Sequence, residues 1–364
     1  MARVYLDHNA TTPLRTQARA AMIDAMDILG NPSSVHAEGR AAKMLVERAR
    51  TQVAELVGCK PQQVIFTSSA TEAAALAVAQ KARHGGTFTA LPTEHDCLGI
   101  WSEDTLTSAY DKDGQSAPTA PELRGLVALS AANSETGILG AGGRVNGSGE
   151  GFSALCDITQ MAGKIPVAYE AVTPSYAILS AHKMGGPKGI GALINFTADD
   201  PEPMLRGGGQ EMNRRSGTEN ITGIAGFGAA ARAAGADVAA GRWDEVAQLR
   251  SILEKAIASA SDQTIFVGNE VDRLPNTSCM LTPGWKGETQ VMQMDIAGFA
   301  ISAGSACSSG KVKASKVLLA MGYYEAEAAS AIRVSLGLET TQDDVLAFAD
   351  AWARRFEKHQ MRAA

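Results

Sequence analysis

The segment SAHKMGG, residues 180–186, contains a lysine whose surroundings could make its amine reactive. Lys183 follows the apolar run YAILS, which predicts a buried strand, and precedes two glycines that predict a tight turn. An amine held in this way can lose its water shell, and its pKa then falls, as an imine-forming lysine requires. The alternative is an ordinary surface lysine in a loop, an interpretation that suits Lys188 nearby.

The segment LCDITQ, residues 155–160, places a carboxylate at the end of another apolar run. Asp157 could pair with the protonated nitrogen of a pyridine ring, and a protonated ring makes pyridoxal phosphate (PLP) an electron sink. Gln160 follows three residues later and lies within the same turn. A helix N-cap is the other interpretation of this aspartate.

Arg333 is the third candidate, because it stands between Ile332 and Val334 in the short apolar strand predicted by AIRVSLG. A guanidinium in such a strand needs a partner. A bidentate substrate carboxylate would satisfy it, and so would a structural salt bridge.

Further polar segments could complete a site for a phosphorylated ring. TSSATEA, residues 67–73, follows a predicted strand and opens a helix, where backbone N–H groups and hydroxyls bind phosphate; an ordinary N-cap with Glu72 is the alternative. His95 in TEHDC could stack on a ring or move a proton, or be structural. RRSGTEN offers either anion ligands or a polar turn in Arg215, Ser216 and Thr218.

Cys307 lies in ISAGSACSSG, residues 301–310, which has almost no apolar bulk. A structural cysteine normally has large apolar neighbours, so this thiol indicates reactivity. The other cysteines are Cys59, Cys97, Cys156 and Cys279, and the odd total without a Cys-x-x-Cys pair argues against a disulfide framework or a zinc site. We expect a reduced compartment and no metal.

The elements that must position these residues alternate along the chain. Strands are predicted at 63–67, 125–131, 151–157, 176–181 and 191–196, and helices at 41–57, 71–82 and 241–260. This alternation predicts an α/β layer with a mostly parallel sheet, in which ligands collect at the carboxyl ends of strands.

The composition excludes several classes of protein. The 364 residues are 45% hydrophobic, which is enough for more than one packed domain. The formal net charge of −6 does not suit a nucleic-acid binder. The N-terminus lacks the apolar core of a signal peptide and no stretch suits a membrane span, so we expect a cytoplasmic protein.

The order of the motifs resembles the cysteine desulfurases of the NifS/IscS type, which are class V, fold-type I PLP enzymes. The resemblance covers nearly the whole chain. The segments that carry it are VYLDHNATTP, GNPSSVHAEGR, FTSSATEAAALA, TEHD, DITQMAGKIPV, SAHKMGGPKGIG, RGGGQEMNRRSGTEN, RLPNTSCML, SAGSACSSG and AIRVSLGLETT.

The resemblance implies a role for each candidate. Lys183 would be the Schiff-base lysine, and Cys307 the thiol that takes sulfur from L-cysteine as a persulfide, leaving L-alanine. The sulfur would pass to an acceptor protein for iron–sulfur cluster assembly or for thiolation of a cofactor or tRNA. The remaining implied contacts are Asp157 with the ring nitrogen; Gln160 and Ser134 with the ring hydroxyl; His95 on the ring face; Ala70, Thr71, Ser180 and His182 around the phosphate; Thr218 on the phosphate from the other subunit of a homodimer; and Arg333 with Asn31 and Ser134 at the substrate, with the NATT segment, residues 9–12, close by.

The pattern changes near residue 241, where a long helix begins, and this change predicts a domain boundary at about 240–250. A large PLP-binding domain would span residues 11–244, with a mostly parallel seven-stranded sheet between helices. A smaller α/β domain would comprise residues 1–10 and 245–364 and carry the mobile cysteine loop at about 301–314.

The chain departs from the family pattern at three places. Ser134 stands where the family has asparagine, a glycine-rich piece at 140–151 replaces a helix, and KVKA at 311–314 replaces an acidic turn. Two rival functions therefore stay open: another PLP reaction, such as selenocysteine or cysteine-sulfoxide lysis or aminotransfer, and a weakly active paralog that serves as a scaffold for sulfur carriers.

Overall fold

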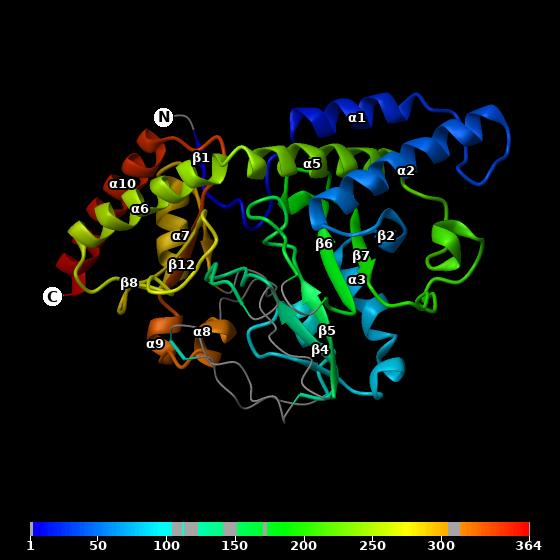
Figure 1. Cartoon of the computed structure of the whole chain (residues 1–364). Helices are drawn as coiled ribbons and strands as arrows, with labels where there is room; N and C mark the ends of the chain where they lie inside the picture. The colour runs from blue at the N-terminus through cyan, green and yellow to red at the C-terminus, as the bar shows by residue number, and fades with distance from the viewer. Residues whose placement is uncertain are drawn as a thin grey trace.

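The protein has a mixed α/β architecture built around two main sheets, which confirms the predicted fold class. The computed structural model describes residues 3–103, 111–112, 123–140, 151–169, 173–304 and 314–363. Cys307 lies outside these residues. Figure 1 shows the larger sheet to the right of the smaller one, with the C-terminal helix at the left edge.

The larger sheet has the strand order β2-β7-β6-β5-β4-β3. β3, β4, β5 and β6 are parallel neighbours, whereas β7 is antiparallel to both β2 and β6, so the prediction of a mostly parallel sheet is confirmed. Seven strands were expected, and the described residues form six. Their apolar runs are buried on both faces, as in parallel sheets covered by helices. The strands are β2 (Val64–Thr67), β3 (Phe88–Ala90), β4 (Gly125–Ser130), β5 (Phe152–Asp157), β6 (Tyr176–Ser180) and β7 (Gly191–Asn195).

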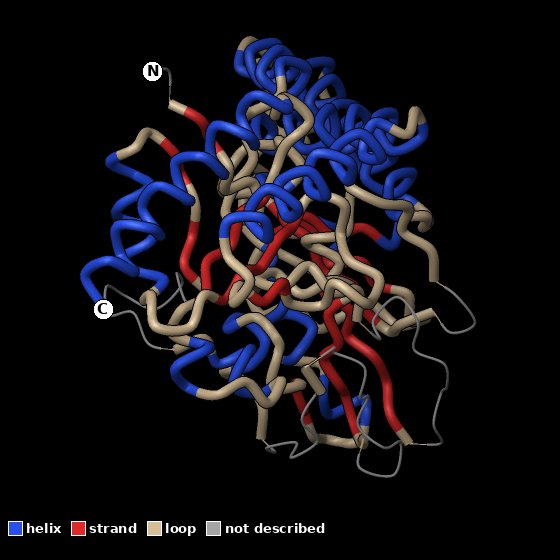
Figure 2. Tube along the Cα trace, turned by 90° about the vertical axis from the view of Figure 1, so that its left-hand side faces the viewer, coloured by secondary structure: helices blue, strands red, loops and turns tan. Residues whose placement is uncertain are grey.

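Helices cover both faces of this sheet. Leu179 of β6 belongs to the core formed with α1, α2 and α5, whereas the next residue back, Ile178, belongs to the core formed with α3 and α4. In Figures 1 and 2 the first group of helices lies together above the strands. The bounds are α1 (Thr16–Met26), α2 (Ala37–Val57), α3 (Ala70–Val78), α4 (Asp96–Gly99) and α5 (Ile221–Ala239), with short 3-10 turns η1 (Pro61–Gln63), η2 (Lys81–His84), η5 (Ala181–Lys183) and η6 (Gln210–Asn213).

The smaller sheet is antiparallel, in the order β11-β12-β9-β8. Ile332 and Val334 of β12 point into a core with Trp285 and Trp352, so Arg333 between them points to the opposite face. The elements are β8 (Ile265–Phe266), β9 (Thr277–Leu281), β11 (Ser302–Ala303) and β12 (Ala331–Ser335), with α6 (Arg242–Ala260), α7 (Gly287–Ile296), α8 (Lys316–Ala320), α9 (Glu325–Ala328) and α10 (Gln342–Ala363).

The N-terminal segment joins the two sheets. β1 (Val4–Tyr5) pairs in parallel with β10 (Phe299–Ala300), and Asp7 forms a β-bridge with Ser335 at the end of β12. Further along, the Thr12 N–H donates to the His182 carbonyl, beside the end of β6. Residues 6–12 therefore cross from the smaller sheet to the edge of the larger one where strands β4, β5 and β6 end.

The predicted helices are found, and two of them differ in length. The helix expected at 41–57 is α2, which begins earlier, at Ala37, and Gly58 ends it in the left-handed conformation, with φ 69°. The helix expected at 71–82 ends at Val78, because Gln80 turns back to donate to the carbonyls of Leu76 and Glu202. None of the helices in the described ranges is long and apolar enough to cross a membrane.

Candidate active site

Lys183 lies in η5, directly after the carboxyl end of β6. Its Nζ donates to the backbone carbonyls of Asn9, at 2.7 Å, and Ala10, at 2.8 Å. Gly185, with φ 86°, closes the turn after it against the side chain of Arg15. The amine is therefore held by carbonyl groups at the edge of the sheet, whereas Lys188 is exposed.

Asp157 and Gln160 lie at the end of the neighbouring strand, β5. Asp157 Oδ1 accepts from the Thr159 N–H at 2.9 Å, a local bond of the kind expected for a capping residue, and no described residue donates to Oδ2. Gln160 is buried, and its Nε2 donates to the Asn9 carbonyl at 3.0 Å. Gln160 and Lys183 thus meet at one carbonyl oxygen.

The start of α3 lies against the ends of β6 and β7. Gly191 of β7 pairs with Ser180, and a Cβ on Gly191 would lie 2.8 Å from the Ala70 nitrogen, so glycine is needed for this close approach. The Ser69 hydroxyl accepts from the Glu72 N–H, as an N-cap does. This arrangement brings the first N–H groups of α3, including those of Ala70 and Thr71, beside Ser180.

His182 follows Ser180 by two residues and lies in η5. Its Nδ1 is 3.1 Å from the Thr11 Oγ1. Burial, with the positive charges of Lys183 and Lys188, lowers the pKa of His182 to about 4. The ring is therefore neutral at pH 7 and can donate or accept a hydrogen bond without adding charge.

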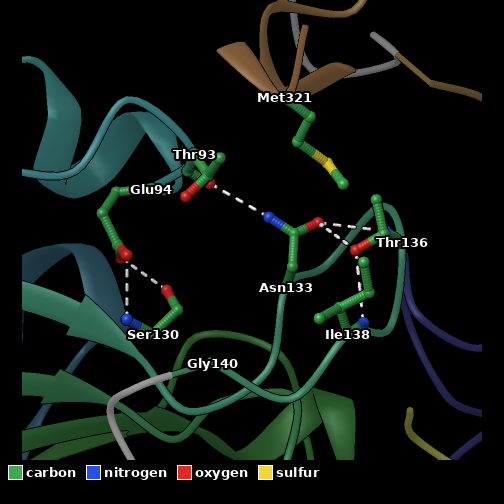
Figure 3. Close-up of a pocket in the computed structure, with 8 residues that line it drawn as sticks. All are labelled: Thr93, Glu94, Ser130, Asn133, Thr136, Ile138, Gly140 and Met321. Atoms are coloured by element: carbon green, nitrogen blue, oxygen red, sulfur yellow. Dashed lines mark hydrogen bonds between the residues drawn. The ribbon is translucent and has the colours of Figure 1, made fainter. Parts of the chain in front are cut away.

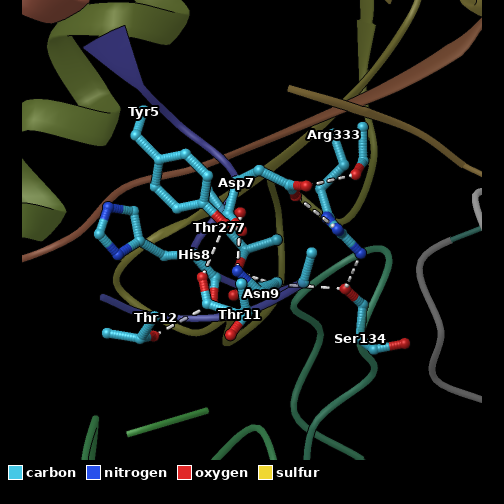
Figure 4. A network of polar contacts seen from close by, with 12 residues as sticks. Tyr5, Asp7, His8, Asn9, Thr11, Thr12, Ser134, Thr277 and Arg333 are labelled. Atoms are coloured by element: carbon cyan, nitrogen blue, oxygen red, sulfur yellow. Dashed lines mark hydrogen bonds and ion pairs between the residues drawn. The ribbon is translucent and has the colours of Figure 1, made fainter. Parts of the chain in front are cut away.

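Arg333 is buried between the two sheets (Figure 4). Its Nη2 is 2.7 Å from Asp7 Oδ1, and its Nη1 donates to the Ser134 carbonyl at 3.0 Å. Its Nε is buried and has no partner among the described residues. The structural ion pair considered for Arg333 is therefore present, and it uses only part of the five N–H groups of the guanidinium.

The turn at 133–137 holds Ser134 in place. Asn133 Oδ1 accepts from the N–H groups of Glu135 and Thr136, and its Nδ2 donates to the Thr93 carbonyl across a cavity of about 30 Å³ (Figure 3). Ser134 contacts Arg333 through its backbone carbonyl, and Figure 4 shows its hydroxyl pointing away from the guanidinium. The serine in place of asparagine therefore leaves this contact intact.

Glu94 and His95 lie above the ends of β4 and β5. Glu94 is completely buried and accepts from the Ser130 N–H at 2.8 Å, and Ser130 is paired with Asp157. His95 is the exposed N-cap of α4, and its Nδ1 accepts from the Cys97 N–H at 3.1 Å. That bond leaves Nε2 as the protonated nitrogen of the neutral ring.

Burial, with a smaller contribution from the charge of Asp157, raises the pKa of Glu94 from 4.5 to about 7. The folded protein then binds a proton that the unfolded chain has lost, so this group makes stability fall as pH rises from about 4.5 to about 7. We expect Glu94→Gln, which copies the protonated acid, to remove this loss, a difference of up to about 3 kcal/mol above about pH 8. Urea unfolding at several pH values measures it; the exposed control Glu288→Gln should keep the wild-type slope, and an unchanged slope in Glu94→Gln would contradict the prediction.

Two predicted residues are not brought to this site within one chain. Asn31 is exposed in the turn between α1 and α2, where its Oδ1 accepts from the Ser33 N–H, and Figure 1 places this turn at the far side of the molecule from β12. Thr218 is also exposed, and its segment is tied to α3 by the ion pair between Arg215 and Glu72, at 2.8 Å.

The cysteines in the described ranges are poor nucleophiles. Burial raises the pKa of the Cys59 and Cys279 thiols to about 12, and it raises those of Cys97 and Cys156 still further. Thiolate is the reactive form, so these thiols are unreactive at pH 7. Cys307 lies outside the described residues.

Of two central residues, the resemblance placed Asn9 near the substrate as part of the NATT segment, and Lys164 was missed in the sequence. Asn9 is almost fully buried, and its side chain donates to the Ser134 carbonyl and to Thr277 Oγ1 (Figure 4). Lys164 is buried beside it and donates to Asn9 Oδ1 and Gln160 Oε1. The spacing of four residues between Gln160 and Lys164 was the available signal, but it is common in polar turns.

These donors and acceptors fit PLP. The first N–H groups of α3, Ser180 and neutral His182 suit a phosphate, the open Oδ2 of Asp157 suits a ring N–H, and Lys183 supplies the amine. The unpartnered Nε of Arg333 suits a carboxylate. In the described part of the chain, no group of three or more His, Cys, Asp or Glu side chains is placed to hold a metal ion.

Comparison with known proteins gives consistent matches. The family model described as aminotransferase class-V matches residues 4–107 and 118–348. A cysteine desulfurase of Frankia sp. (strain EuIK1) is 37% identical over 96% of this chain and 90% of its own length, and one of Cereibacter sphaeroides is 37% identical over 95% and 93%. The crystal structure of a NifS-like protein from Rickettsia africae is similar with a TM-score of 0.85 and 30% identity, covering 98% of this chain and 99% of that one.

Proposed function

Because the chain belongs to the class-V aminotransferase family, whose PLP enzymes have fold type I, we propose that it is a cysteine desulfurase. It would take sulfur from L-cysteine and release L-alanine. Its similarity to cysteine desulfurases over nearly the whole chain supports the reaction.

One geometric observation carries the assignment of the site. Asn9 connects the amine of Lys183 to the guanidinium of Arg333: its carbonyl accepts from Lys183, and its side chain donates to Ser134, whose carbonyl accepts from Arg333. An amino-acid substrate needs a group that handles its amine and another that binds its carboxylate, a short distance apart. Lys183 and Arg333 meet this requirement.

When bound, PLP supplies an electron sink that activates the substrate at its α-carbon. Lys183 would hold the cofactor covalently, with Asp157 at the ring nitrogen, Gln160 and Ser134 near the ring hydroxyl, and His95 on the ring face. Phosphate ligands would be Ala70, Thr71, Ser180 and His182, with Thr218 from the second subunit of a homodimer. Asn31, which lies far from Arg333 within one chain, would also reach the substrate from that subunit.

The residues of the chain would then act in sequence. Arg333 binds the substrate carboxylate, and the Lys183 amine carries the proton removed from the α-carbon. The Cys307 thiolate attacks the substrate sulfur, so that a sulfur–sulfur bond forms while the bond from that sulfur to Cβ breaks. Cβ is protonated and alanine leaves, and the net change is cysteine plus thiol to alanine plus persulfide. The persulfide sulfur would pass to an acceptor protein.

The test uses the purified protein loaded with PLP. L-cysteine should yield alanine and protein-bound persulfide in equal amounts before any reductant is added. Selenocysteine, a cysteine sulfoxide and an amino-group acceptor are offered in parallel. If one of these compounds is turned over faster than L-cysteine, and L-cysteine leaves no persulfide on the protein, the protein catalyses that other reaction and not desulfuration.

We expect Arg333→Lys to raise the KM for L-cysteine more than it lowers kcat. Lysine keeps the positive charge beside Asp7 but cannot grip a carboxylate with two N–H groups, so kcat/KM should fall by about 10-fold or more. Steady-state kinetics measure the change, with Arg354→Lys on the exposed face of α10 as the control. An unchanged KM would mean that Arg333 forms its structural ion pair with Asp7 but does not bind the substrate carboxylate.

We also propose the domain division at residues 244 and 245, in the first turn of α6. Gly241, with φ 69°, separates α5 from α6, and each main sheet has its own core. The N-terminal residues 1–10 would belong with the smaller domain because β1 pairs with β10.

A further inference from the structure

Lys164 is an unusual residue in the wall of the site. It follows Gln160 by four residues and is only 2% exposed. Its Nζ donates to Gln160 Oε1 at 2.8 Å and to Asn9 Oδ1 at 3.1 Å. Among the described residues, no carboxylate lies within ion-pair distance of it.

Burying an unpaired amine is unfavourable, and apolar side chains of the same length would fit with less loss of stability. Burial, with the positive charges of Lys183 and Arg333, holds the pKa of Lys164 well below its usual value. His8, also buried, faces the same amine, and burial and Lys164 lower its pKa to about 4. A buried lysine whose charged neighbours are the cations Lys183 and Arg333 indicates a function that an apolar residue would not provide.

The contacts of Lys164 help to determine the orientation of the Gln160 side-chain amide. The side-chain amide of Gln160 can turn either its oxygen or its nitrogen toward a neighbour. Lys164 donates to Gln160 Oε1, and Gln160 Nε2 donates to the Asn9 carbonyl, which can only accept and also accepts from Lys183, so the two contacts together fix the amide. The Lys164 amine needs two N–H groups for its bonds to Gln160 and Asn9, and it has at least two in both its charged and its neutral form.

Lys164 fixes Asn9 by the same means. Asn9 Oδ1 accepts from Lys164 and from Asn276 Nδ2, at 3.0 Å, so the Asn9 amide nitrogen must face Ser134 and Thr277. The carbonyl of Asn9 is then held where Lys183 and Gln160 both reach it.

We propose that Lys164 is a positioning residue, which orients the Gln160 amide so that its N–H donates toward the ring hydroxyl of a cofactor bound at Lys183. The inference rests on the proposed PLP chemistry and goes beyond it, since Lys164 itself touches neither substrate nor cofactor. Loss of Lys164 leaves Gln160 Oε1 without this donor and leaves Asn9 Oδ1 with Asn276 as its remaining donor, so both amides are held less firmly.

The experiment compares PLP-loaded wild type with Lys164→Met. A hydrogen-bond donor to the ring oxygen, and any positive charge beside that oxygen, favours the deprotonated form of the lysine-bound chromophore. The variant loses this effect, so the pKa of the chromophore, followed through its visible absorption band, should rise. The apparent PLP dissociation constant should rise about 10-fold, the effect of one well-placed hydrogen bond. Absorbance titration and cofactor release measure both quantities without reference to turnover.

A double-mutant cycle with Gln160→Leu tests the route of the effect. If Lys164 acts through Gln160, Lys164→Met should shift the band much less when Gln160 is already leucine. An equal shift in both backgrounds would overturn the inference. If Lys164→Met does not fold, Lys164→Gln, which is too short to reach both acceptors, takes its place with the same expected direction.

Two controls separate positioning from general damage. Lys43→Met removes an exposed lysine from α2, and Leu253→Ala weakens the core of the smaller sheet. Neither should change the band pKa or PLP binding, although Leu253→Ala should lower the unfolding temperature. Wild type that binds no PLP at Lys183 would refute the proposed function, whereas normal wild type with an unshifted Lys164→Met band would refute only the role of Lys164.

Discussion

Replacing Cys307 by serine is expected to abolish alanine production while leaving PLP binding intact. Serine keeps the size of the side chain and its hydrogen bonding, but its hydroxyl is a far poorer nucleophile toward sulfur. The variant should show the wild-type visible spectrum and still change its spectrum on addition of L-cysteine. Persulfide labelling followed by peptide mass analysis should find the label on Cys307 in wild type and on no peptide of the variant.

Cys97→Ser is the matched control, because Cys97 lies two residues from His95 and is the nearest rival thiol. Its burial and the surrounding carboxylates of Asp157 and Glu94 raise its pKa, so it should not carry sulfur. The control should therefore keep wild-type alanine production and labelling. Label on Cys97, or full alanine production by Cys307→Ser, would overturn the proposed mechanism.

Replacing Lys183 by alanine is expected to remove covalent PLP and lower turnover by at least about 1,000-fold, the scale of losing a proton-transfer group together with the anchoring amine. Wild type should be yellow, and borohydride should fix the cofactor to Lys183. Peptide mass analysis of the reduced protein identifies the residue. The variant should hold PLP only by noncovalent contacts and release it on dialysis.

Lys188→Ala provides the comparison for this prediction. Lys188 is exposed and lies five residues further along the same turn, so it tests whether any nearby lysine can serve. The control should keep the visible band, the borohydride adduct and its turnover. An adduct on Lys188, or no adduct in wild type, would refute the assignment of Lys183.

The positions of the main elements could be read from local patterns. Apolar runs of five to seven residues predicted β2 and β4 to β7, and the glycines that follow β6 placed Lys183 at a strand end. These patterns act over a few residues, because strand burial and turn conformation depend on neighbours in the chain. For the same reason, Asp157 could be placed at the end of β5 without knowledge of the fold.

The arrangement around Asn9 could not be read in this way. Its carbonyl meets Lys183, 174 residues away, and its side chain meets Asn276, 267 residues away. Such contacts depend on how the N-terminal segment passes between two separately folded sheets, and no periodicity in the sequence encodes that path. The pairing of Arg333 with Asp7 and with the Ser134 carbonyl depends on the same packing.

Composition and motif spacing alone therefore determined the α/β class, the strand ends and the types of reactive side chain. The tertiary structure decided which polar groups share a hydrogen bond and which lysine is buried. Lys164 illustrates the physical reason. In the sequence it is one more polar residue in a turn. In the folded protein it is buried beside Asn9 and Gln160, away from water, and its two hydrogen bonds to them must satisfy its amine.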